Sequence, residues 1–158
     1  MACSVWGVPL LTADMTGTSV SQAISPDSNV IVVGIRAWII QNNNPSYTSI
    51  NMKIYSNSGL DTPRALIATS TNSLTKSAMF GSSNSGLKEV CFLFDNVLLK
   101  ASDTYHLVIN GVSYTGDASS HLAWRKSFTE PVYRTNADTS YEGLAVSSLL
   151  VSVIGAKL

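Results

Sequence analysis

Apolar and polar residues alternate along this chain with the period of β-strands, in short segments separated by turn formers. Ile50–Tyr55 alternates residue by residue, as in a strand with one face in a core and one in water. Val90–Phe94 and Tyr105–Ile109 are richer in β-branched and aromatic residues, which is typical of buried strands. We expect these two segments to form the centre of a sheet, with Val97–Leu99 as a separate short apolar segment between them.

Similar segments along the rest of the chain predict the remaining strands. They are Ser19–Ile24, Val30–Ile40, Ala65–Ser70, His121–Lys126 and Leu144–Ile154. The alternative is a buried helix segment for Val30–Ile40 and an amphipathic helix for Leu144–Ile154. Residues 71–87 and 128–141 are rich in polar residues and indicate loops, the first with a weak edge strand as the alternative. About eight or nine strands with frequent turns indicate an all-β, single-domain antiparallel β-sandwich, with a jelly roll as the preferred topology.

Residues 1–18 show no sustained period, although they include the apolar residues Trp6, Leu10 and Leu11. We interpret them as an extended N-terminal arm that docks on its own sheet or on a neighbouring subunit. Residues 19–158 then form the sandwich domain. A chain of 158 residues is long enough for one core without metals or disulfides.

Composition excludes several classes of partner. Charged residues make up 13% of the chain and balance to zero, which argues against nucleic-acid binding and against electrostatic attachment to membranes. No apolar stretch is long enough to span a bilayer, and the N-terminus lacks the basic region of a secretory signal, so synthesis in a cytoplasm is expected. The two cysteines, Cys3 and Cys91, do not suggest a disulfide, and Cys91 is expected to be a buried thiol.

Several motifs together resemble a known group of domains. They are Lys53–Gly59, Pro63 with Leu66–Ser70, Phe92–Phe94 and Leu98–Val108. This combination resembles jelly-roll sandwich domains of bacterial surface proteins and phage virion proteins over about residues 30–126. Unlike the surface proteins, this chain is expected to lack a signal peptide, a linker and a second domain, so the resemblance implies a free-standing capsid decoration or cement protein.

Motifs for catalysis are sparse. His106 alternates with apolar residues and is expected to be hydrogen-bonded within the fold or at the surface. His121 could pair with Asp117 in a hydrolase, but neither a nucleophile elbow nor a zinc pattern nor a phosphate loop accompanies it. We therefore expect no enzyme activity, no cofactor and no bound metal.

The richest group of aromatic and polar residues lies in the last third of the chain. It includes Tyr114, Asp117, His121, Trp124, Arg125, Tyr133 and Arg134. Such residues can be core and solvated neighbours, anchors of a protein interface, or a platform on which sugars stack.

These observations lead to a hypothesis of function. We expect a non-enzymatic virion protein that decorates a phage capsid, made in the host cytoplasm, with the major capsid protein as partner and a homotrimer as the favoured oligomer. Interface candidates are Trp6, Leu10, Leu11 and the aromatic and polar group above. The alternative is a carbohydrate-binding or adhesive module that uses Tyr114 and Trp124 against glycans. Nucleic acid and membrane are not expected as partners.

Overall fold

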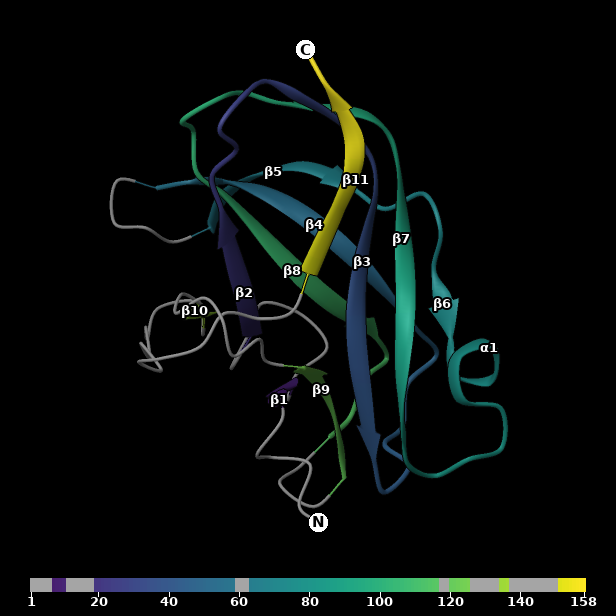
Figure 1. The fold of residues 1–158 in the computed structure, drawn as a ribbon. Helices are drawn as coiled ribbons and strands as arrows, with labels where there is room; N and C mark the ends of the chain where they lie inside the picture. The colour runs from purple at the N-terminus through teal and green to yellow at the C-terminus, as the bar shows by residue number, and fades with distance from the viewer. Residues whose placement is uncertain (1–6, 11–18, 59–62, 117–119, 126–133, 137–150) are drawn as a thin grey trace.

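Two antiparallel β-sheets pack face to face in the computed structural model of this chain (Figure 1). The structure describes residues 7–10, 19–58, 63–116, 120–125, 134–136 and 151–158. The predicted all-β sandwich is therefore confirmed, while the jelly-roll topology stays a prediction.

Sheet I has five strands arranged around one long strand. It consists of β1 (Gly7–Leu10), β9 (His121–Arg125), β3 (Val30–Asn42), β11 (Val151–Lys157) and β7 (Gly86–Leu99). On one edge β3 pairs with β7 over nearly its whole length. Its other edge is shared, because β11 pairs with the first part of β3 and β9 with the last part.

Sheet II has six strands with β8 near its centre. It consists of β10 (Arg134–Asn136), β2 (Ser19–Ile24), β8 (Tyr105–Val112), β4 (Ser49–Asn57), β5 (Pro63–Thr69) and β6 (Leu74–Thr75). Both β5 and β6 pair with the same edge of β4. The bounds of β2 match the predicted segment, and Pro63 begins β5, a position where its missing N–H is tolerated.

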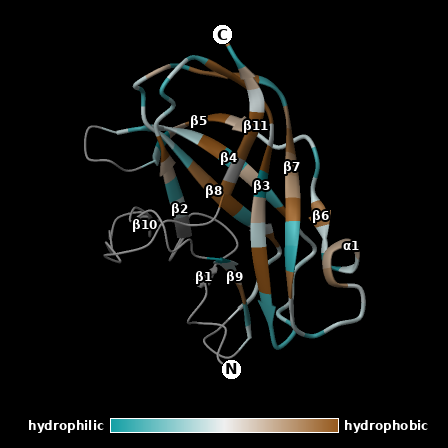
Figure 2. Ribbon diagram, in the orientation of Figure 1, coloured by the Kyte–Doolittle hydropathy of each residue, from teal (hydrophilic) through white to brown (hydrophobic). Residues whose placement is uncertain are grey.

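The core lies between the sheets. Hydrophobic and hydrophilic residues follow one another along the strands that supply it (Figure 2). Along β4, Ile50, Met52 and Ile54 are buried, whereas Asn51 and Lys53 between them are partly exposed. The largest fully buried apolar side chains from both sheets are Trp124, Phe92, Ile35, Ile39, Ile50, Met52, Ile54, Leu99, Leu107 and Leu122.

The two segments predicted as one central pair belong to different sheets. Val90–Phe94 lies in β7 of sheet I and Tyr105–Ile109 in β8 of sheet II, so this prediction is wrong. Val97–Leu99 is not a separate segment either, because it forms the last part of β7. A register shift in the pairing with β3 precedes it, and Asn96 has a φ of 49° there. The short connection after Leu99 therefore crosses from one sheet to the other instead of closing a hairpin.

The region predicted as a loop or weak edge strand contains β6 and a short helix, α1 (Lys76–Phe80). The Thr75 hydroxyl accepts a hydrogen bond from the Ala78 N–H at 3.2 Å and caps the first turn of this helix. Met79 and Phe80 are buried against the core. One helical turn anchored by two side chains leaves no sustained period in the sequence, so the pattern did not indicate it.

Part of the predicted N-terminal arm belongs to the sandwich. Gly7–Leu10 forms β1 and pairs with β9 of the same chain, with Leu10 opposite Leu122. Of the two docking sites considered for the arm, its own sheet is therefore correct for these four residues.

Candidate functional site

Two aromatic residues of the predicted binding group are buried. Trp124 has no exposed surface and packs in the core, and Tyr114 is 6% exposed. The Tyr114 hydroxyl oxygen accepts a hydrogen bond from the Leu122 backbone N–H at 2.9 Å. Sugar binding needs rings with an open face. The prediction that these two rings form a sugar-stacking platform is therefore wrong, and the interpretation of Trp124 as a core residue is correct.

The structure describes three further members of that group. His121 is buried at the start of β9, and Arg125 is partly exposed at its end, opposite Gly7 of β1. The backbone of Arg134 pairs with Ser21 in sheet II. The remaining candidates lie outside the described residues: Trp6, Leu11, Asp117 and Tyr133.

A buried polar network closes the end of the sandwich near Tyr114. The ring of Tyr47 lies 6.3 Å from that of Tyr114, and the Tyr47 hydroxyl donates to Gln41 Oε1 at 2.9 Å. The Gln41 side-chain amide in turn donates to the Ser83 carbonyl at 2.8 Å. Burial raises the pKa of Tyr47 well above its usual range, so this hydroxyl stays protonated and serves as a structural donor.

His106 lies between two polar side chains on sheet II. Its Nε2 is 2.8 Å from Asn57 Oδ1, and its Nδ1 is 3.5 Å from Ser21 Oγ. A hydroxyl, an imidazole and an orienting oxygen in this order are also the parts of a nucleophilic triad. However, Ser21 and His106 have no exposed surface, so a substrate could not reach the hydroxyl. The prediction of a hydrogen-bonded histidine is confirmed, although the sequence did not indicate its partners.

The outer face of sheet I carries exposed apolar side chains. Leu87 and Leu93 of β7 alternate with core residues and are 50% and 49% exposed, and Leu98 beyond the register shift is 48% exposed. Between the first two, Arg36 and Glu89 form an ion pair at 3.7 Å. We call this surface the β7 face and define it by these five residues: Arg36, Leu87, Glu89, Leu93 and Leu98.

Cys91 lies on the same side of β7, between Glu89 and Leu93. Its thiol is free and partly exposed, which corrects the expectation of a buried thiol. A Cβ atom built on Gly34 would lie 3.3 Å from its Sγ and 3.6 Å from Ile154 Cδ1. The thiol therefore continues the apolar character of the β7 face toward β3 and β11.

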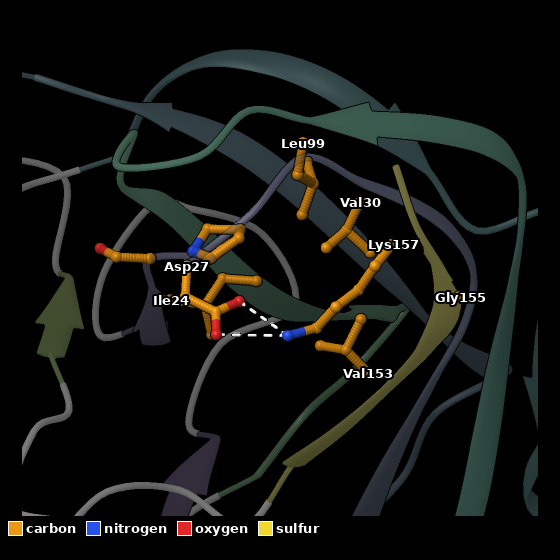
Figure 3. Close-up of a pocket in the computed structure, with 9 residues that line it drawn as sticks. Ile24, Asp27, Val30, Leu99, Val153, Gly155 and Lys157 are labelled. Carbon is orange, nitrogen blue, oxygen red and sulfur yellow. Dashed lines mark hydrogen bonds and ion pairs between the residues drawn. The ribbon is translucent and has the colours of Figure 1, made fainter.

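A pocket opens beside the C-terminal strand, at the end of the sandwich where the β2–β3 turn approaches β11 (Figure 3). Its volume is about 320 Å³. Four aliphatic side chains line it, from strands of both sheets: Ile24, Val30, Leu99 and Val153. At its rim Lys157 Nζ contacts Asp27 Oδ1 at 3.1 Å and Oδ2 at 3.2 Å.

The charged pair at this rim is open to water. The side chain of Asp27 is 81% exposed and that of Lys157 is 69% exposed. The hydrogen bond and charge of Lys157 lower the pKa of the Asp27 carboxyl below its usual value. Sequence reasoning missed this pocket, because Asp27 lies in a predicted turn and Lys157 at the end of the chain.

Comparisons with known proteins do not assign the chain to a family. No protein-family model matches it, and no curated protein matches its sequence. Within the described residues, no helix is both long and apolar enough to cross a membrane. In the same part of the chain, no group of three His, Cys, Asp or Glu side chains is placed to hold a metal ion.

Proposed function

We propose that this chain is a non-enzymatic structural protein of a virus particle, a decoration or cement protein that stabilises a capsid by contacts between subunits. The observation that carries the proposal is the β7 face. Three leucines of β7, each about half exposed, lie on the outer side of sheet I, two before the register shift and one after it, and none of them belongs to the buried core cluster.

The chemistry of this face suits a protein partner. Exposed apolar residues that gather on one surface mark sites of association, because their burial removes apolar area from water. The Arg36–Glu89 pair lies among the leucines and would fix the register of a partner through charge complementarity. Sheet I is a rigid platform for such contacts, since β3 is hydrogen-bonded along both edges.

The virion assignment rests on the resemblance of the motifs in residues 30–126 to jelly-roll domains, and on the all-β sandwich to which the described residues of this range contribute. In this role the chain forms a closed homo-oligomer, with a trimer favoured, and contacts the major capsid protein. Binding to the assembled shell would stabilise it by mass action.

Sedimentation tests the proposal. The purified chain alone should sediment as an oligomer, and it should co-sediment with capsid shells assembled from the major capsid protein of its virus. Leu93→Asp should weaken one or both associations at least about tenfold, because it places a charge in a buried contact. The matched control is Leu66→Asp on β5, where a leucine of similar exposure, 54%, lies in the other sheet. A strict monomer that never co-sediments with capsids would overturn the proposal.

A further inference from the structure

Hydrogen bonds hold together the segments that form the walls of the pocket beside β11. The Ser102 N–H donates to the Pro26 carbonyl at 3.0 Å, and the Ala101 N–H donates to Asn29 Oδ1 at 2.8 Å, which ties the β2–β3 turn to the β7–β8 connection. The Leu158 N–H donates to the Asn29 carbonyl at 2.9 Å and holds the end of the chain against the same turn. A pocket whose walls are fixed in this way loses little conformational entropy when a ligand binds.

The interior of the pocket selects for an aliphatic body. Val153 remains 40% exposed although it belongs to a strand of the sandwich, and Val30 and Ile24 are also only partly buried. An apolar guest would remove these side chains from water. The volume of about 320 Å³ lies at the small end of the range for ligand pockets, so the guest is a small molecule.

The charged pair at the rim favours a ligand whose polar group is neutral. Lys157 and Asp27 balance each other in charge, so an added carboxylate would meet Asp27 and an added ammonium would meet Lys157. The Lys157 ammonium has three donor hydrogens, and its two contacts with Asp27 leave one to donate. A hydroxyl group can accept that hydrogen and donate its own to the carboxylate, which satisfies both members of the pair.

We propose that this pocket binds a small neutral alcohol, with its aliphatic body against Ile24, Leu99 and Val153 and its hydroxyl at the Asp27–Lys157 pair. The proposal does not depend on the capsid role, because the pocket and the β7 face are formed by different residues.

The test uses three probes that share one ring: cyclohexanol, cyclohexanecarboxylate and protonated cyclohexylamine. Each is titrated into the full chain, and binding is followed by the backbone amide signals of Ser25, Gly155 and Lys157 in NMR spectra. Cyclohexanol should shift these signals and should bind at least about tenfold more tightly than either charged probe. Equal binding of all three probes, or shifts confined to other residues, would overturn the proposal.

Rim variants make the test sharper, since both side chains are exposed and can be replaced without disturbing the core. Lys157→Gln should leave the Asp27 charge unbalanced, so that cyclohexylamine gains affinity and cyclohexanol loses it by about tenfold. Asp27→Asn should shift the preference toward the carboxylate. Lys88→Gln, at an exposed lysine of β7 outside the pocket, should change nothing.

A third variant tests the apolar interior. Val153→Trp should fill the pocket and abolish binding of all three probes. If this variant does not fold, the exchange of probe preference in the two rim variants decides the matter. A preference that stays the same in Lys157→Gln and Asp27→Asn would contradict the assigned role of the pair.

Discussion

The hydroxyl of Tyr114 and the backbone N–H of Leu122 are joined by a buried hydrogen bond of 2.9 Å. Tyr114 follows β8 of sheet II, whereas Leu122 lies in β9 of sheet I. One tyrosine therefore connects the two layers at the end of the sandwich. The Tyr114 hydroxyl is therefore used within the fold, and it is not available to bind a ligand.

Tyr114→Phe should destabilise the domain by about 1–3 kcal/mol, because it leaves the Leu122 N–H without this acceptor in a buried position. The free energy of unfolding, measured by urea denaturation, checks this. Tyr55→Phe is the matched control, since Tyr55 is only partly buried on β4 and should tolerate the change with a much smaller loss. Equal losses in the two variants would show that the interlayer bond has no special weight.

A second link between the layers runs through Asn72. Its Oδ1 accepts from the Leu93 N–H at 2.7 Å, and its Nδ2 donates to the Cys91 carbonyl at 3.0 Å. The side chain thus satisfies two backbone groups on the edge of β7, where an open strand would invite pairing with other chains.

Asn72→Ala should lower stability by about 1–2 kcal/mol and should speed hydrogen exchange at the Leu93 amide. Asn84→Ala, in the exposed segment before β7, serves as the control and should leave both quantities near the wild-type values. The Leu93 amide is the informative probe. Unchanged exchange there would mean that the edge is protected by something other than Asn72.

The sequence predicted the strands better than their partners. The alternation in β4 and the apolar run in β3 define strands because each residue's burial depends on its own position in the pleat. Which strand pairs with which depends instead on contacts between segments that are far apart in the sequence. Val90–Phe94 and Tyr105–Ile109 are close in sequence and similar in composition, yet the chain between them crosses from one sheet to the other.

The candidate sites were harder to predict for a related reason. Tryptophan and tyrosine occur both in protein cores and in binding surfaces, so residue type alone does not distinguish the two. Only the arrangement of the sheets shows that Trp124 and Tyr114 are buried. The pocket joins Asp27 to Lys157, which are 130 positions apart in the chain. The alternation on β7 did contain a signal for the exposed leucines, because Leu87 and Leu93 share one strand face.

β11 passes so close to β3 at Gly155 that the position has no room for a side chain. A Cβ atom built there would lie 2.1 Å from the Ile31 carbonyl oxygen, at the register shift between β11 and β3. Gly155→Ala should therefore push β11 away from β3 and destabilise the domain by about 1–3 kcal/mol.

Urea denaturation measures this loss, and hydrogen exchange along β11 should show where it arises. Gly86→Ala is the control, since a Cβ atom there would meet only Phe80 ring carbons at 3.5 and 3.6 Å, an ordinary contact. A Gly155→Ala variant as stable as the Gly86→Ala variant would contradict a tight approach of β11.

The Asp27 carboxyl should titrate below the usual carboxyl pKa of about 3.9. Because the pKa is lowered in the folded state, the stabilisation by this group is complete above the unfolded value. It is lost as the pH falls through the folded value. The effect on stability should be small, since both partners are exposed and salt screens them.

The carboxyl carbon signal of Asp27 in an NMR titration gives this pKa directly. In Lys157→Gln the value should rise toward the usual carboxyl pKa, because the hydrogen bond and the charge of Lys157 are the two largest causes of the shift. Lys88→Gln keeps the Asp27–Lys157 contact and should leave the titration unchanged. An Asp27 pKa that is the same in wild type and Lys157→Gln would mean that the Asp27–Lys157 contact does not form in solution.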